Sequence, residues 1–270
     1  MFIKANKINS CYIGPQISSE QFIAEHFFLF LLKGSIQGYD GHKSYSLKAG
    51  EACIVRKNHL ARYRKQKEDG NFEKVVVVFD QEFLKQYQEK YRIYADGQSI
   101  KNAFFAVAKN ELITSFITSL APYYEASGVI DEYFTNVKRE ELLLILLKNK
   151  PELVNILFDF GKPEKIDLEA FMNQNFRFNV AIQRFAFLTG RSLTVFKQDF
   201  KRIFNDTPSH WLLRKRLQEA YFLINKKGRK ASDVYLEVGF EDLSHFSFTF
   251  KKLFDISPSQ LSAQYHSKSI

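Results

Sequence analysis

The sequence lacks the residues that disulfide-bonded and metal-binding domains depend on. It has two cysteines, Cys11 and Cys53, with no CxxC motif and no histidine cluster near them. This excludes a disulfide framework and a thiolate zinc site, and it favours a reducing cytoplasm as the location of the protein. The chain has no uncharged apolar run of about 18 residues, and its start lacks the apolar core of a signal peptide. We therefore expect a soluble chain that is not exported and does not enter a membrane.

Signatures of enzymes are absent too. No phosphate-binding glycine loop, catalytic triad or pair of catalytic carboxylates stands out in the sequence. A metal needs several convergent donors, whereas His26, His42 and His59 stand singly. An enzyme fused to a DNA-binding module, as in alkyl-transfer repair regulators, would need a reactive cysteine, and neither cysteine has a recognisable context. We predict no catalytic residue, no metal and no cofactor.

Apolar, aromatic and basic residues are abundant instead. A chain of 270 residues with 45% apolar and 16% aromatic side chains can form two domains with cores. The net charge is +9, and the excess is uneven, because residues 166–270 hold 16 Lys and Arg against 10 Asp and Glu, while residues 1–165 hold 23 against 20. The C-terminal two-fifths are therefore the part expected to meet an anionic partner.

One ten-residue pattern occurs twice, at 200–209 and again at 250–259. Each copy closes a basic, aromatic helix in which one face can pack while the other meets phosphate. In each copy a hydroxyl residue comes directly before a proline, which is typical of a helix N-cap followed by Pro at the first helical position. A helical stripe over 209–227 predicts one long helix that joins the two similar units.

Each copy is preceded by a helical segment and a short turn with a glycine. Helix, turn and helix is the helix-turn-helix arrangement, whose second helix enters the major groove of DNA with its N-terminus first. Gly190 and Gly239 let the chain reverse without a Cβ clash, and Ser192 and Asp242 are the expected N-caps of the second helices. The sequence predicts helix pairs at 180–188 with 193–204 and at 231–238 with 243–254.

The first part of the chain follows a different periodicity. Up to about residue 95 it reads as short strands separated by turns, which indicates a small antiparallel sandwich or barrel. Helical periodicity then covers 101–127 and 131–149. The run 141–148 is too apolar for a solvated helix, so its own barrel or a partner chain must cover it. We place the domain boundary at 160–163, before Asp167 caps a new helix, and the expected strands are 26–32, 44–47, 51–55 and 75–79.

The segment 166–266 resembles the DNA-binding domain of AraC/XylS-type transcription regulators. This resemblance implies two helix-turn-helix units that place recognition helices in successive major-groove segments on one face of DNA. It also implies double-stranded DNA and RNA polymerase as partners. The residues that carry it are Gly190, Phe200, Lys201, Phe204 and Pro208 in the first unit, and Val238, Gly239, Phe240, Ser244, His245, Phe246, Phe250, Lys251, Phe254, Ser257 and Pro258 in the second.

The same resemblance gives roles to exposed residues by position. Lys and Gln can read guanine and adenine, whereas Phe248, where members of the family commonly carry Arg, offers only apolar contact, for example with a thymine methyl. Basic residues near the end of each recognition helix suit phosphates, which add affinity without sequence information. The expected base contacts are Thr194, Lys197, Gln198, Ser244, His245, Ser247 and Phe248, and the expected phosphate contacts are Lys201, Arg202, Lys251 and Lys252.

The strand-rich start resembles the cupin-like barrels with dimerisation helices that precede such DNA-binding domains. The segment 50–59 carries this resemblance through its glycine, acidic residue, strand, turn and histidine. A small-molecule or protein effector is therefore expected, and the candidate pocket residues are Arg56, His59 and Arg62, with a solvated basic loop as the alternative. The candidates for a homodimer interface are Leu142, Leu143 and Leu146.

Together these patterns predict an α+β chain. A cupin-like antiparallel β-barrel at 1–95 with dimerisation helices at 101–158 is followed, at 166–270, by an all-α domain with two helix-turn-helix units joined by a long helix. The predicted function is that of a cytoplasmic, sequence-specific DNA-binding transcription regulator, modulated by an effector or partner and by dimerisation. The alternative, motivated by Phe248, is an effector- or protein-binding regulator whose DNA binding is weakened or non-specific.

Overall fold

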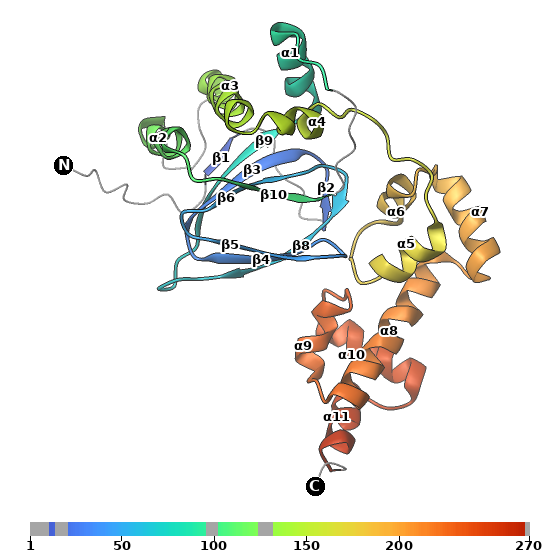
Figure 1. Ribbon diagram of the computed structural model, residues 1–270. Helices are drawn as coiled ribbons and strands as arrows, with labels where there is room; N and C mark the ends of the chain where they lie inside the picture. Colours follow the sequence, from blue (N-terminus) through green and yellow to red (C-terminus); the bar gives the residue numbers. More distant parts are fainter. Residues whose placement is uncertain (1–10, 14–20, 96–101, 124–131, 268–270) are drawn as a thin grey trace. The chain divides into compact units, whose positions relative to one another are not determined.

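The chain divides between Gly161 and Lys162 into two units, Met1–Gly161 and Lys162–Ile270 (Figure 1). The computed structural model describes residues 11–13, 21–95, 102–123 and 132–267. Within these ranges the first unit contains the strands and the second unit is helical. The N-terminal start, residue 101 and residues 124–131, for which the sequence also made predictions, lie outside the described residues.

Short strands in the first unit form a five-stranded sheet, a three-stranded sheet and a two-stranded pair. The five-stranded sheet has the order β1-β9-β3-β6-β10, and the three-stranded sheet has the order β5-β4-β8. All pairings are antiparallel except that of β1 with β9, which is parallel. The strands are β1 Cys11–Ile13, β2 Phe22–Ile23, β3 His26–Lys33, β4 Ser35–Tyr39, β5 Ser44–Lys48, β6 Ala52–Val55, β7 His59–Leu60, β8 Arg62–Gln66, β9 Glu73–Phe79 and β10 Phe104–Val107.

The central strands β3 and β9 are buried on both faces. Alternate residues point to opposite faces of a strand, so Val75 and Val77 join an apolar cluster on one face while Val76 and Val78 join a second cluster on the other. The second cluster lies between the two larger sheets, because it also contains Ile36 of β4. Burial on both faces explains why these strands are continuous apolar runs in the sequence.

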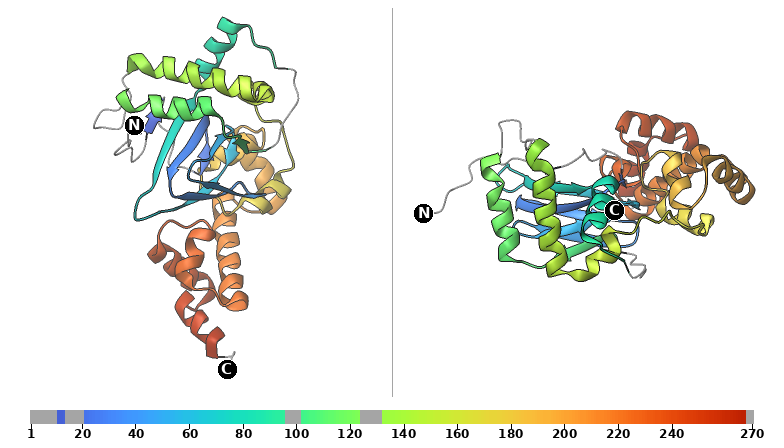
Figure 2. Two further views of the ribbon diagram at one scale, coloured as in Figure 1. Left: turned by 60° about the vertical axis from the view of Figure 1, so that its left-hand side comes forward. Right: turned by 90° about the horizontal axis from the view of Figure 1, so that it is seen from above.

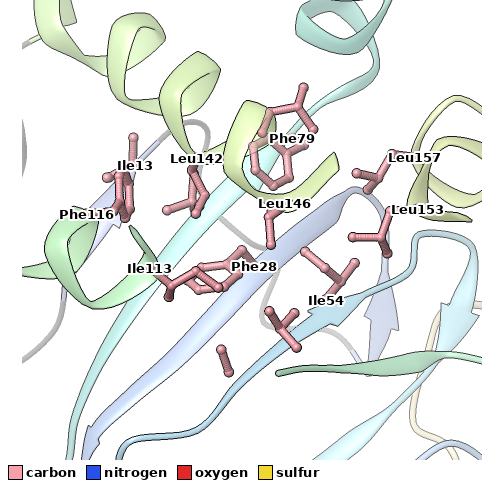
Figure 3. Packing of buried hydrophobic residues seen from close by; sticks show 14 of the residues in the cluster. Ile13, Phe28, Ile54, Phe79, Ile113, Phe116, Leu142, Leu146, Leu153 and Leu157 are labelled. Atoms are coloured by element: carbon pink, nitrogen blue, oxygen red, sulfur yellow. The ribbon is translucent and has the colours of Figure 1, made fainter. Parts of the chain in front are cut away.

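Helices cover the other face of the five-stranded sheet. Helices α2 (Glu111–Ser119) and α3 (Glu132–Asn149) lie side by side across it (Figure 2), followed by the short α4 (Val154–Leu157). Figure 3 shows Leu142 and Leu146 of α3 pointing into the cluster around Phe28. Removing this face from water contributes about 1.5 to 3 kcal/mol for each large apolar side chain.

The first unit differs from the sequence prediction in three ways. Helix α1 (Gln81–Tyr91) lies in the region predicted to be strands, where the Asp80 carboxylate accepts a hydrogen bond from the Phe83 amide and caps it. Strand β10 lies in the segment predicted to be helical, because its alternate residues Phe105 and Val107 pack on the sheet beside β6. The sheets are cupin-like as predicted, but among the described strands they form separate sheets and not a closed barrel, and β1 pairs with β9 in parallel.

The second unit consists of short helices arranged around one long helix, α8. Asp167 caps the first helix as predicted, since its carboxylate accepts a hydrogen bond from the Ala170 amide at 3.0 Å. Helix α8 ends at Gly228, which has a φ of 64° in the left-handed region that favours glycine. The helices are α5 Leu168–Asn175, α6 Ile182–Leu188, α7 Leu193–Phe204, α8 Pro208–Lys227, α9 Ala231–Glu237, α10 Leu243–Phe254 and α11 Pro258–Ser267.

Candidate nucleic-acid interface

Helices α7 and α10 are built alike, fifty residues apart. Each begins at a capping side chain: the Ser192 hydroxyl accepts a hydrogen bond from the amide of Val195, and the Asp242 carboxylate accepts one from the amide of His245. Each ends at a residue in the left-handed conformation, Asn205 after α7 and Asp255 after α10. The repeated sequence pattern therefore corresponds to a repeated helix with the same start, length and end.

The turns before these helices need glycine for two reasons. Gly190 has a φ of 65° and Gly239 a φ of 94°, which L side chains rarely adopt. A Cβ on Gly190 would also stand 2.5 Å from the carbonyl oxygen of Glu164, and a Cβ on Gly239 would stand 2.6 Å from that of Arg177. Both turns therefore combine a reversal of the chain with close packing against a neighbouring backbone segment.

One face of each of these helices is buried and the opposite face is open. The buried face carries phenylalanines at helical spacing, with Phe196 and Phe200 in α7 and Phe246 and Phe250 in α10 fully buried. Every residue predicted to contact bases or phosphates lies on α7 or α10, and all are exposed except Ser247, which is half-buried. On each helix the structure brings these residues together near the N-terminus and along the open side.

The charges on the open face of α7 are not equivalent. The Arg202 guanidinium pairs with the Asp199 carboxylate at 2.7 Å, and Arg191 donates a second hydrogen bond to the same group at 3.0 Å. The hydrogen bond from Arg191 contributes most to holding the pKa of Asp199 below its usual value. Part of the Arg202 charge is thus compensated within the protein, so Lys201 is the better placed of the two for a phosphate.

The fifty-residue offset also indicates one residue that the sequence reasoning missed. His245 of α10 was a predicted base contact, and the corresponding position in α7 is Val195, which is 40% exposed. Aligning the two copies through their recognition helices would have identified it. Val195 adds an apolar group beside Thr194 at the start of α7.

The three predicted effector residues of the first unit make separate contacts. Arg56 pairs with Asp159 at 3.3 Å, near the end of the unit. The His59 ring nitrogen Nδ1 lies 2.8 Å from the carbonyl oxygen of Lys57, and the Arg62 guanidinium lies over the ring of Tyr39. A common pocket for the three residues stays a prediction.

The predicted dimer contacts Leu142, Leu143 and Leu146 were assigned to the wrong surface. All three are fully buried in the core of their own unit, packed on the five-stranded sheet. An apolar helix can be covered by its own sheet or by a partner, and here the sheet covers these leucines. Among the side chains of α3 that the structure describes, the exposed apolar ones are Phe134, Val137 and Leu144.

The remaining titratable and apolar features do not point to metal, thiolate or membrane chemistry within the described residues. No group of three His, Cys, Asp or Glu side chains that could hold a metal ion occurs within the described residues. Both cysteines are buried, and burial raises the pKa of the Cys53 thiol to about 12, so it is not a thiolate at neutral pH. No helix in the described ranges is long and apolar enough to cross a membrane.

Comparison with known proteins decides what the two units are. A family model described as a helix-turn-helix domain matches residues 185–264, and one described as the ExsA N-terminal regulatory domain matches residues 26–156. The chain belongs to the AraC family of transcription regulators. As an AraC-family member it is a DNA-binding regulator of transcription and not an enzyme, so the predicted class of function and the predicted α+β fold class are confirmed.

Two relatives of this AraC-family chain match nearly its whole length. The thermoregulatory protein LcrF of Yersinia pestis is 24% identical over 85% of this chain and 86% of its own. The HTH-type transcriptional regulator ExsA of Pseudomonas aeruginosa is 20% identical over 94% of this chain and 92% of its own. The similarity therefore includes both units and the segment between them.

Proposed function

We propose that this regulator binds two successive major-groove segments of one DNA, with α7 and α10 as the two recognition helices. The observation that carries the proposal is the matching construction of these helices: each is capped, each has a buried phenylalanine face, and each leaves polar and basic residues open. A helix that enters the groove N-terminus first presents its first two turns to the base edges. Thr194, Lys197 and Gln198 occupy those turns in α7.

The two helices are proposed to differ in how they read DNA. Lys197 can donate to guanine acceptors and Gln198 can pair with adenine, while Val195 adds an apolar contact. The corresponding part of α10 offers Ser244, His245, Ser247 and Phe248, of which Phe248 can contact only apolar groups. Contacts to phosphate are assigned to Lys201, Lys251 and Lys252, with a smaller share for Arg202 because of its ion pair.

Selection of bound sites from random DNA, followed by footprinting, tests this proposal. Two protected major-groove segments on one face of the DNA, about one helical turn apart, are expected. A salt series on the selected site and on random DNA separates sequence recognition from charge attraction. Equal affinity for both DNAs at every salt concentration would contradict sequence-specific recognition and favour the alternative, a regulator with non-specific DNA binding.

We further propose that the first unit transmits a signal through the start of the interdomain segment. Arg56 holds Asp159 by an ion pair, and the ammonium groups of Lys57 and Lys85 lie 5.1 and 5.7 Å from the centre of the Phe160 ring. An anionic effector or an acidic partner at Arg56 would compete with Asp159 and release this segment. The Arg56, His59 and Arg62 surface therefore remains the proposed effector site.

The variant Asp159→Asn tests this transmission in the full chain. It is expected to change DNA affinity although Asp159 lies outside the DNA-binding unit. Asp69→Asn is the matched control, because Asp69 also pairs with a cation of the first unit, Lys33, at 3.4 Å. Unchanged affinity in both variants would count against transmission through Asp159.

A homodimer is proposed through the exposed residues of α3. Phe134, Val137 and Leu144 are exposed on α3, and exposed apolar side chains on one helix can serve as a site of association. Light scattering after size exclusion is expected to give a dimer for the wild type and a monomer for Val137→Glu. Leu112→Glu, which changes an exposed leucine of α2, is expected to remain dimeric. A wild-type monomer at micromolar concentration would refute the dimer.

The direction of regulation and the contact with RNA polymerase are proposed from the similarity to known regulators. The virulence regulon transcriptional activator VirF of Yersinia enterocolitica is 24% identical over 85% of this chain and 86% of its own. By that similarity we propose that this protein activates transcription in the cytoplasm by contacting RNA polymerase at the promoter. In vitro transcription with purified polymerase on a selected site is expected to rise with added protein, and a fall would make it a repressor.

A further inference from the structure

The two helix-turn-helix units have separate apolar cores. In the first, Phe171 and Phe185 pack together, and Phe200 packs on Trp211 near the start of α8. In the second, every fully buried member of the cluster lies between Leu217, midway along α8, and Leu261 of α11. The long helix α8 contributes to both cores, with Trp211 in the first and Leu217 in the second, and Figure 1 shows it running from one set of short helices to the other. Beside α8, polar side chains also connect the two helix-turn-helix units.

Arg216 of α8 makes the most direct of these connections. Its guanidinium donates hydrogen bonds to the carbonyl oxygens of Phe176 and Phe178, both at 2.7 Å. These two residues lie between α5 and α6 in the first helix-turn-helix unit. It donates a third, at 3.2 Å, to the carbonyl of Gly239, in the turn before the second recognition helix. One planar, rigid donor group thus holds backbone of both units.

Arg177, which belongs to the first helix-turn-helix unit, reinforces the same junction. It pairs with Glu219 of α8, and its Nη1 lies 3.9 Å from Glu237 at the end of α9. Glu237 is held in turn by Arg229 at 2.6 Å. The Arg177 carbonyl is also the atom that a Cβ on Gly239 would approach to 2.6 Å. Backbone packing and ion pairs therefore act at one place.

We infer that the junction of Arg216 and Arg177 fixes the angle between α7 and α10 and so sets the spacing of the two DNA segments that the protein accepts. This rests on the proposed function, in which both units contact DNA. Adding one base pair between the segments moves the second by about 3.4 Å and rotates it by about 35° around the DNA axis. A rigid junction cannot follow that change, whereas a loosened junction can.

The test measures affinity of the full chain for the selected site and for the same site with one base pair inserted or removed between the segments. For the wild type we expect a loss of about tenfold or more on either change. In Arg216→Lys, which keeps the charge but not the three-way hydrogen bonding, affinity at the native spacing falls and the loss on insertion shrinks toward onefold. Arg214→Gln is the control, because it removes a charge from the same helix but outside the junction, and its spacing preference should match the wild type.

The outcomes separate this inference from the proposed function. If Arg216→Lys and Glu219→Gln both keep the wild-type spacing preference, whatever their overall affinity, the role of the junction is overturned. Two-segment binding would be left intact by that result. A wild type that protects two segments but ignores their spacing would overturn the role of the junction alone, and a wild type that protects a single segment would overturn both. Melting temperatures identify any variant that has lost its fold, and the second variant then carries the test.

Discussion

Phe248 is the residue whose replacement best separates folding from recognition. It lies on α10 with 70% of its surface exposed, whereas Phe250, two residues further on, is fully buried. Phe248→Ala should therefore change the free energy of unfolding by no more than about 0.5 kcal/mol. Phe250→Ala should reduce the free energy of unfolding by about 3 to 5 kcal/mol, because it leaves a cavity in the core of the second helix-turn-helix unit.

The effect of Phe248→Ala on DNA binding follows from the exposed area. A Phe side chain offers about 200 Å² of surface, and covering 70% of it at about 25 cal/mol per Å² would contribute at most about 3.5 kcal/mol. A groove edge covers one side of the ring, so about half of this value is expected. The predicted loss of affinity is roughly tenfold to twentyfold.

The assay replaces each thymine of the selected site with uracil, which removes only the methyl group. At one position in the second segment this should weaken the wild type but not Phe248→Ala, because the contact is already lost in the variant. Phe222→Ala is the control, since Phe222 is an exposed phenylalanine of α8. Wild-type affinity in Phe248→Ala, with no thymine dependence in either protein, would refute the contact and favour a protein partner at α10.

Three further predictions follow from the site and the core. Lys197→Ala and Gln198→Ala should change which sequences bind, whereas Lys201→Ala should weaken all sites alike and lower the salt slope by about 1; equal losses on every sequence would contradict these roles. Burial lowers the pKa of His26 well below its usual value, so the folded state stays neutral while the unfolded state gains a proton. Stability should therefore fall by about 1.4 kcal/mol per pH unit below pH ~6.5, and urea unfolding of His26→Gln should show a flatter pH dependence. Gly239→Ala should destabilise the second helix-turn-helix unit by about 1 to 3 kcal/mol, and an unchanged melting temperature would be inconsistent with the φ of 94° at Gly239.

The second unit was the more predictable because its signals are local. Capping residues such as Ser192 and Asp242, a glycine in each turn and phenylalanines at helical spacing act within a few residues of one another. The predicted helix pairs and the long joining helix are all present. Local signals could not reveal the junction, because Arg216 and Phe178 are 38 residues apart.

The first unit was less predictable because its strands depend on distant partners. The segment 104–107 has an apolar pattern that fits a helix or a strand, and only pairing with β6 makes it a strand. The leucines of α3 show the same limit. Their apolar side chains must be buried from water, but the sequence did not tell whether they pack against the sheet or against a second chain.

The sequence by itself determined the class of the protein, since the repeated pattern at Phe200 and Phe250 and the two glycine turns define paired helix-turn-helix units. Periodicity and capping depend on neighbouring residues, so they can be recognised from the sequence alone. Only the tertiary structure decided which face of α3 is free and what connects the two helix-turn-helix units. These depend on contacts between residues far apart in the chain, and burial, ion pairing and orientation arise only when those residues are brought together.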